Sequence, residues 1–272
     1  MDSRFDRLGL LVRELNDGSR IVVSLFGGHV LSWVAGGRER LYLSGTAVAD
    51  ARQAIRGGVP VCFPQFSGRG LLPKHGFART QRWRELPSDN AQSIRLQLVE
   101  NDETLRLWPH SFSLELHVTL QPQALAMRLE VRNTGAQEWS FTGALHTYLR
   151  VEDVSTTRLS GLQGLRVEDT LRNVIEPVAE ESPNLEKPID NVYHDISSPL
   201  ELRGRSETLR IEQNGFADAV VWNPGTDGAS RISDVGTGEE RHFLCVEAAQ
   251  VRTPVVLGPG GVWTGSQIVR AL

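Results

Sequence analysis

The sequence predicts an all-β protein built as a large antiparallel β-sandwich, which we expect to form a single domain over residues 1–272. Short runs that alternate apolar and polar residues recur along the chain, as they do in half-buried strands. No long segment repeats apolar residues at helical spacing. The 26 glycines and 13 prolines are spread along the whole chain, where they punctuate turns. Many short strands without intervening helices favour antiparallel sheets packed face to face.

The predicted strands follow in chain order. The first is an apolar, β-branched run at 20–34, and residues 93–98 then alternate strictly. Residues 113–120, SLELHVTL, place every second apolar side chain on one face, and 125–131, LAMRLEV, repeat that pattern. Because only residues 121–124 separate these two runs, they are expected to form a hairpin. The remaining apolar runs predict strands at 209–212, 219–222, 242–251 and 267–269.

Composition restricts the class of function. The formal net charge is −4, so the global balance gives no indication of nucleic-acid binding. The two cysteines, Cys62 and Cys245, lie in apolar runs and are typical of a reducing compartment rather than a disulfide framework. The apolar run near the N-terminus is too short for a signal peptide or a membrane span. We therefore expect a soluble, cytoplasmic monomer.

The sequence does not support a bound cofactor or metal ion. GPGGVWTG, at 258–265, is neither a Walker loop nor a dinucleotide fingerprint, and no helical pattern follows it. HExxH, CxxC and HxH do not occur, and the seven histidines are scattered. We expect neither a cofactor nor a metal site.

Two polar residues break the pattern of their surroundings. Glu247 lies inside an apolar run, HFLCVEAAQV, that is typical of a strand buried on both faces. Burial of an unpaired carboxylate is costly, so Glu247 is either a structural residue, in a salt bridge or at the end of a sheet, or a tuned general base. His146, in FTGALHTYLRV, lies on the polar side of an alternating run, two residues before Tyr148. That side is either the wall of a cleft or a solvated sheet face, and the local pattern leaves both open.

A basic segment runs from Arg56 to Arg84 without any aspartate or glutamate. In an acidic protein, this segment makes a locally positive patch suited to a phosphate or carboxylate. The alternative is a solvated charge run, but interleaved aromatic residues argue against it. The cations are Arg56, Arg69, Lys74, Arg79, Arg82 and Arg84, with His75 among them.

The same segments carry a family resemblance. From Arg56 to the C-terminus the chain contains, in order, RGGVPVCFPQF, LPKHGFAR, WPHSF, ALHTYLRV, DNVYHD, VVWNPG, FLCVEAAQV and GPGGVWTG. With these motifs the chain resembles the aldose 1-epimerase (galactose mutarotase-like) superfamily, and is most similar to its glucose-6-phosphate 1-epimerase branch. The first two motifs together distinguish this branch from mutarotases of free sugars. The resemblance implies a large antiparallel sandwich that binds its sugar in a cleft on one sheet.

The resemblance also implies a reaction, the exchange of α and β anomers of a hexose 6-phosphate. His146 matches the general acid of the family and Glu247 its general base. The corresponding hypothesis is a protonated His146 and an ionised Glu247 on opposite sides of C1. The residues implied in substrate binding are Arg56, Gln65, Lys74, His75, Arg79 and Asp190.

These binding residues have distinct implied contacts. His75 matches a histidine that contacts the sugar near its ring oxygen. Asp190 matches an acidic residue that holds sugar hydroxyls, with Asp195 as an alternative. Arg56, Arg79 and Lys74 match the positions that grip the phosphate, and Gln65 lies in the stretch that lines the pocket.

Three other functions are compatible with parts of the sequence. Within the family, the alternative is a mutarotase for free aldoses, in which the basic segment would be structural. Asp190 and Glu247 could instead be the carboxylate pair of a glycosidase, although a central His146 is less natural there. A non-catalytic carbohydrate-binding module would suit a β-sandwich with six tryptophans, but it would not need a glutamate in an apolar strand.

Overall fold

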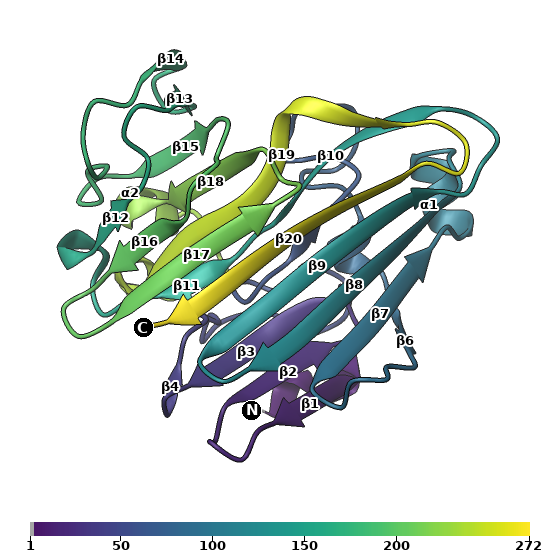
Figure 1. Ribbon diagram of the computed structural model, residues 1–272, viewed down its shortest axis with the longest axis horizontal. Coiled ribbons are helices and arrows are strands. Elements are labelled where there is room, and N and C mark those ends of the chain that lie inside the picture. Colours follow the sequence, from purple (N-terminus) through teal and green to yellow (C-terminus); the bar gives the residue numbers. More distant parts are fainter. Residues whose placement is uncertain (1–2) are drawn as a thin grey trace.

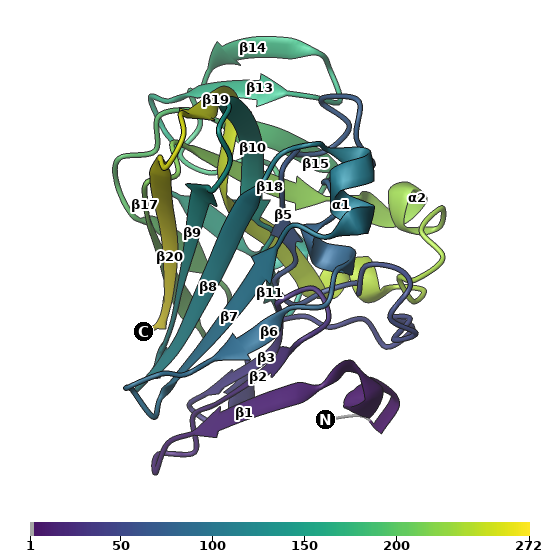
Figure 2. The same cartoon turned by 90° about the vertical axis from the view of Figure 1, so that its right-hand side faces the viewer.

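The computed structural model describes residues 3–272 and consists mainly of antiparallel β-strands (Figure 1). Two eight-stranded sheets pack face to face, and a four-stranded sheet adjoins one end of the sandwich (Figures 1 and 2). One large hydrophobic cluster draws side chains from both eight-stranded sheets. The predicted all-β antiparallel sandwich is therefore confirmed.

The first large sheet, called here the site sheet, carries the candidate functional residues. Its strands lie in the order β14 (Val174–Pro177), β13 (Arg166–Asp169), β15 (Ile189–Tyr193), β18 (Asp218–Asn223), β19 (Phe243–Leu257), β10 (Trp139–Leu145) and β5 (Val61–Cys62). Strand β11 (Tyr148–Arg150) also pairs with β19. The longest strand, β19, is thus central, with β18 on one side and β10 and β11 on the other.

The second large sheet, called here the outer sheet, closes the sandwich. Its strands lie in the order β12 (Arg158–Ser160), β16 (Leu200–Arg203), β17 (Thr208–Asn214), β20 (Val262–Ala271), β9 (Ala124–Asn133), β8 (Phe112–Gln121), β7 (Ser93–Val99) and β6 (Arg84–Leu86). The small sheet consists of β1 (Leu10–Glu14), β2 (Arg20–Ser24), β3 (His29–Ala35) and β4 (Arg38–Glu39).

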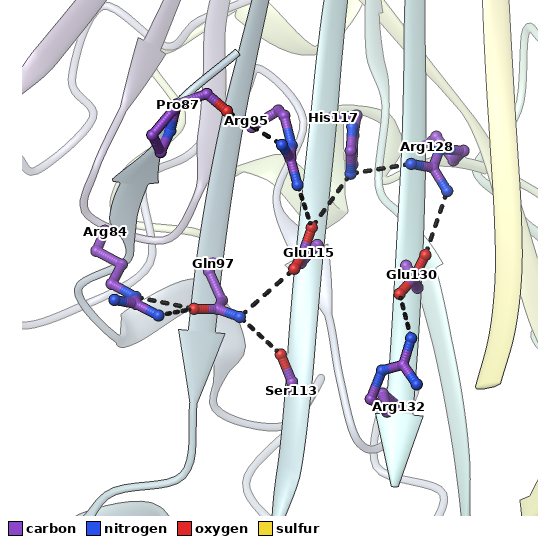
Figure 3. A network of polar contacts seen from close by, with 10 residues as sticks. All are labelled: Arg84, Pro87, Arg95, Gln97, Ser113, Glu115, His117, Arg128, Glu130 and Arg132. Atoms are coloured by element: carbon purple, nitrogen blue, oxygen red, sulfur yellow. Dashed lines mark hydrogen bonds and ion pairs between the residues drawn. The ribbon is translucent and has the colours of Figure 1, made fainter. Parts of the chain in front are cut away.

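The outer sheet shows the alternation that its sequence predicts. Leu116 of β8 is buried in the core, whereas Glu115 and His117 point to the opposite face. There Arg95 of β7 donates to Glu115 at 3.0 Å, and Arg128 of β9 lies 2.9 Å from the imidazole of His117 (Figure 3). Strands β8 and β9 form the predicted hairpin, with a turn at residues 122–123. The 20–34 run is divided between β2 and β3, which pair with each other.

Helices are short, as the sequence predicts. The α-helices are α1 (Asp102–Leu107) and α2 (Gly225–Ala229), and the 3-10 helices are η1 (Ser3–Leu8), η2 (Ala78–Thr80), η3 (Val154–Thr156) and η4 (Glu239–His242). Within residues 3–272, no helix has the length and apolar character needed to cross a membrane.

Residues 243–251 of β19 are buried on both faces, as the apolar run predicts, whereas residues 252–256 are mostly exposed. Leu244, Val246 and Ala248 enter the core between the two large sheets. Cys245 and Glu247 point to the other face of the site sheet, where they are also buried. That second face, which loops cover, holds the candidate site.

Candidate active site

A cavity lies on the covered face of the site sheet, with about 560 Å³ of empty space that is partly open to solvent. Seven of the eight residues that the resemblance singles out line it: Arg56, Lys74, His75, Arg79, His146, Asp190 and Glu247. The other lining residues are Phe66, Ser67, Val220 and Trp222. The fold thus gathers residues from positions 56 to 247 into one cavity.

Strand register places part of this lining in rows across the site sheet. Trp222 of β18 is paired with Asp190 of β15 on one side and with Cys245 of β19 on the other. Directly paired residues in antiparallel strands point to the same face, so these three side chains share the cavity face. Val220 and Glu247 form the next row on the same face.

His146 lies at an interruption between two strands. Strand β10 ends at Leu145, β11 begins at Tyr148, and the amide of His146 donates to the carbonyl oxygen of Pro60 at 3.0 Å. Thr147 points the opposite way and donates to the side chain of Gln267 at 2.5 Å. The run FTGALHTYLRV is therefore not one continuous strand. His146 and Thr147 nevertheless point to opposite faces, as the alternation predicts.

His146 forms part of a cavity wall, which decides between the two alternatives that the sequence leaves open. Its side chain is 8% exposed, and its ring stacks on Tyr148 with centroids 4.7 Å apart and planes 7° from parallel. The ring of Trp222 lies nearly perpendicular to the imidazole, with the two centroids 6.1 Å apart. This aromatic packing orients the imidazole.

Glu247 lies against His146. Its Oε1 is 3.3 Å from Nδ1 of His146, which is within ion-pair range, but the two atoms are not aligned for a hydrogen bond. Among the described residues, neither His146 Nδ1 nor Glu247 Oε2 has a hydrogen-bond partner, and the glutamate side chain is only 1% exposed. Buried polar atoms without partners are rare, and a ligand in the adjoining cavity would satisfy them.

Burial disfavours the charged form of both groups. It raises the pKa of Glu247 well above its ordinary value, and the charge of Asp190 adds to this effect, whereas Arg79 and Lys74 oppose it. Burial also lowers the pKa of His146 well below its ordinary value, with nearby His75, Arg79 and Arg56 acting in the same direction. Both shifts act in the same sense, since they favour a neutral imidazole beside a neutral carboxyl group.

The hypothesis of a protonated His146 and an ionised Glu247 contains the same number of protons. The two states differ only in which of the two groups carries one proton, and the nearest atoms of these groups are 3.3 Å apart. The burial of both groups favours the neutral state before substrate binds.

His75 is held by its loop as a neutral donor. Its backbone is in the left-handed region (φ 66°), and its amide donates to Ser67 O at 2.9 Å. Its Nδ1 accepts from the Ser67 amide at 3.3 Å and lies 3.2 Å from the sulfur of Cys62. Burial, followed by the charges of Arg79, Lys74 and Arg56, lowers its pKa to about 3. With Nδ1 used as an acceptor, the proton of the neutral ring is on Nε2.

The loop that carries His75 requires a glycine after it. Gly76 has φ 69°, and a Cβ atom there would lie 2.1 Å from the carbonyl oxygen of Phe63. The amide of Phe77 donates to that same oxygen at 3.0 Å. The backbone geometry therefore requires the glycine of the HG pair in LPKHGFAR.

Three cations contribute to the cavity. Arg56 is anchored through Nε to Asp234 at 3.1 Å and through Nη1 to the hydroxyl of Tyr148 at 3.0 Å. Arg79 donates through Nη2 to the carbonyl oxygen of Lys74 at 2.7 Å. The side chain of Tyr148 thus joins the Arg56 guanidinium to the imidazole on which it stacks.

The other cations of the basic segment lie elsewhere. Arg69 makes two hydrogen bonds to Glu168, at 2.7 and 3.1 Å. Arg84 belongs to the outer sheet, where it donates to Gln97 (Figure 3). Arg82 does not line the cavity. The positive charges of the basic segment 56–84 are therefore divided between the cavity and other parts of the surface.

Gln65 and Asp195 lie outside the cavity lining. The amide of Gln65 donates to Ser67 O at 3.0 Å and exchanges hydrogen bonds with the backbone of Leu72, so it shapes the loop that leads to His75. The side chain of Asp195 is 78% exposed and faces Arg252 at 3.5 Å. Of the two aspartates considered for the sugar hydroxyls, Asp190 is the one that lines the cavity. Burial raises its pKa.

Several participants were not singled out from the sequence. The sequence does carry a signal for Trp222, because alternation over residues 219–222 places it on the face opposite the core residue Val221. For Tyr148, the sequence shows only that it follows His146 by two positions. Asp234 gave no local signal, because its role depends on a contact with Arg56, 178 positions away.

Comparisons with known proteins agree with this geometry. Residues 12–270 match the family model described as aldose 1-epimerase. A Cenchrus ciliaris protein named "Putative glucose-6-phosphate 1-epimerase" is 37% identical over 259 residues, covering 89% of this chain and 78% of its own. A protein of the same name from Escherichia coli is 30% identical, with 90% and 84% covered.

Solved structures show the same fold. A crystal structure described as a "putative mutarotase" from Salmonella typhimurium superimposes with a TM-score of 0.86 at 26% identity, covering 96% of this chain and 93% of its own. A protein from Synechocystis superimposes with a TM-score of 0.83 at 20% identity, which shows the fold alone. The match of nearly the whole chain establishes that the protein belongs to the aldose 1-epimerase family, as its motifs predict.

Proposed function

We propose that this protein is a mutarotase that interconverts the α and β anomers of a hexose 6-phosphate, with glucose 6-phosphate as its first candidate substrate. The observation that carries the proposal is the buried contact of His146 with Glu247 in a cavity that also presents Arg56, Lys74 and Arg79. The acid–base pair suits the chemistry of C1, and the cations suit a phosphate. The names of the two curated relatives support the same substrate.

The reaction opens and recloses a cyclic hemiacetal. A base removes the proton from the O1 hydroxyl while an acid protonates the ring oxygen O5, so that the C1–O5 bond breaks and an aldehyde forms. Rotation about C1–C2 presents the other face of the aldehyde, and the reverse proton transfers close the ring. A correctly placed acid or base typically contributes about 10²–10⁴-fold to such a step.

We assign both proton transfers to His146 and Glu247, one as the acid and the other as the base. In the proposed assignment Glu247 takes the proton of O1 while His146 gives one to O5, and reclosure reverses these roles. The ionised pair contains the same number of protons as the neutral pair that burial favours, and the nearest atoms of the two groups are 3.3 Å apart. His75 contributes a fixed Nε2 hydrogen to a substrate oxygen near the ring, since its Nδ1 is already an acceptor.

The phosphate would supply binding energy that orients the ring. Charge-assisted hydrogen bonds from guanidinium groups are stronger than neutral ones. Arg56 is held on two sides by Asp234 and Tyr148, which reduces the loss of side-chain entropy on binding. We propose that Arg56, Lys74 and Arg79 bind the phosphate, and that Asp190 holds sugar hydroxyls beside Trp222.

The test is the rate of anomer exchange, measured by NMR exchange spectroscopy on glucose 6-phosphate and on glucose. The enzyme should accelerate exchange of the phosphate ester far more than that of the free sugar. Lys74→Met should lower kcat/KM for glucose 6-phosphate about 10- to 100-fold, from the loss of a charged contact of roughly 1.5–3 kcal/mol. Lys187→Met, which removes a lysine outside the cavity lining, is the matched control.

Each outcome decides between named functions. Acceleration of glucose exchange alone, with no effect of Lys74→Met, would refute the phosphate assignment and favour a free-aldose mutarotase. Acceleration of neither exchange, with normal binding of glucose 6-phosphate, would refute the enzymatic proposal and favour a binding protein.

A further inference from the structure

A second buried thiol lies next to the acid–base pair. Cys245 precedes Glu247 by two positions on β19, so both side chains point to the same face of the sheet. The Cys245 sulfur, one ring nitrogen of His146 and one carboxylate oxygen of Glu247 all lie within 4.8 Å of one another. All three residues are buried. The acid–base chemistry described above does not use the thiol.

These three donors are the types that bind zinc. Zn²⁺ takes thiolate, imidazole and carboxylate ligands at about 2.0–2.3 Å, which separates neighbouring donor atoms by roughly 3.3–3.7 Å in a tetrahedral site. The His146 nitrogen and the Glu247 oxygen are already 3.3 Å apart. Side-chain shifts of about 1 Å would bring the sulfur to the same spacing.

Within residues 3–272, two buried atoms of this cluster lack hydrogen-bond partners, which indicates that the cluster can accept a ligand. Nδ1 of His146 and Oε2 of Glu247 are buried and have no hydrogen-bond partner in the described chain. Both side chains line the cavity, so a fourth metal position would face the space where a water molecule or a substrate oxygen can bind. Three protein ligands with one open position is the arrangement that zinc adopts in accessible sites.

The positive charge around the cavity selects the kind of cation. Arg56, Lys74 and Arg79 would repel a cation bound by neutral or carbonyl ligands. A thiolate and a carboxylate together neutralise Zn²⁺, so the bound site would have no net charge. Hard cations such as Mg²⁺ prefer oxygen ligands and gain little from a thiolate. The cluster therefore favours zinc and other thiophilic cations.

We propose that His146, Cys245 and Glu247 form a zinc site, and that zinc bound there reversibly inhibits the enzyme. The metal would occupy the lone pairs through which His146 and Glu247 exchange protons with the substrate. Zinc and sugar phosphate would consequently compete for the cavity. The inhibition rests on the proposed mutarotase function, whereas the binding of metal does not.

The experiment titrates the full chain with Zn²⁺ against a chromophoric chelator and, separately, with Co²⁺ as a spectroscopic probe. We expect one equivalent of metal, a thiolate-to-cobalt charge-transfer band, and loss of anomer exchange that a strong chelator restores. Glucose 6-phosphate should raise the zinc concentration needed for half-inhibition.

Two cysteine variants separate this site from other zinc binding. Cys245→Ser should keep anomer exchange in metal-free buffer and lose the cobalt band. It should also need at least about 10-fold more zinc for half-inhibition, because loss of a direct ligand costs no less affinity than loss of a residue that only supports a ligand. Cys62→Ser, which changes the other thiol of the chain, should retain the cobalt band. Cys245→Ala is the substitute if the serine variant does not fold.

The outcomes are distinguishable. A cobalt band that survives in Cys245→Ser but is lost in Cys62→Ser would overturn the proposed site, as would tight zinc binding that leaves anomer exchange intact. Metal binding with the expected cysteine dependence, in a protein that exchanges no anomers, would support the metal site and refute the mutarotase function instead.

Discussion

Replacement of Glu247 by glutamine is the most informative perturbation of the acid–base pair. The substitution keeps the size of the side chain and removes its ability to take a proton. Loss of one general base should lower kcat for anomer exchange about 10²–10⁴-fold. This corresponds to about 3–5 kcal/mol of transition-state stabilisation. Binding of glucose 6-phosphate should change little, because we assign the phosphate contacts to other residues.

The same variant should not lose stability. The wild-type carboxyl group is buried, and its Oε2 has no hydrogen-bond partner in the described structure. Its pKa is raised above the ordinary value of 4.5, so the unfolded chain loses this proton first as the pH rises. Glu247 therefore reduces stability above about pH 4.5, and a neutral amide removes that cost. We expect an equal or higher urea midpoint at pH 7.

The assay combines NMR exchange spectroscopy, urea unfolding and calorimetric binding of glucose 6-phosphate. Glu240→Gln is a matched control, because Glu240 is also buried but contacts Thr226 outside the cavity. If Glu247→Gln remained folded and kept exchange within about threefold of wild type, Glu247 could not be the base. A large loss of stability would instead indicate a structural ion pair.

Three further outcomes follow from the geometry. Tyr148→Phe removes the hydroxyl that anchors the Arg56 guanidinium in the cavity. Loss of this hydrogen bond, worth roughly 0.5–1.5 kcal/mol, should raise KM for glucose 6-phosphate about 3- to 10-fold and leave the exchange of free glucose unchanged. Burial lowers the pKa of His29 to about 4 and that of His75 to about 3. The contribution of these neutral histidines to stability is therefore complete above about pH 6.5, and it is lost as the pH falls towards and through their folded-state pKa values. Urea midpoints should decrease from pH 6.5 to pH 5. Gly76→Ala should cost at least about 2 kcal/mol, measured by urea unfolding, because both its positive φ and its close backbone contact disfavour a Cβ.

Each of these outcomes has a specific contradiction. Equal losses of exchange for both sugars in Tyr148→Phe would show that the hydroxyl acts on His146 rather than on phosphate binding. Replacing His29 with glutamine should reduce the acid sensitivity, and an unchanged pH profile would exclude its contribution. Gly37→Ala is the control for Gly76, since its φ is also positive (72°) and no described atom lies within 4 Å of an added Cβ. Equal costs at the two glycines would refute the contact argument.

Local periodicity was sufficient to predict much of the fold. The hairpin of β8 and β9 follows from strict alternation of apolar residues and a short connection, because a strand with one buried face imposes that pattern residue by residue. The apolar run at 242–251 likewise predicted that the first part of β19, residues 243–251, is buried on both faces. The order of the motifs predicted the family, and with it the residues that line the cavity.

Tertiary structure decided what these residues contact. Arg56 and Arg69 are both cations of one segment, yet Arg56 lines the cavity and Arg69 pairs with Glu168, 99 positions away. Local alternation places Cys245 on the same face as Glu247, but its placement beside His146 depends on strand pairing. Alternation reports which face of a strand is buried. Which side chains meet on that face depends on strand order and register, which distant segments of the chain establish together.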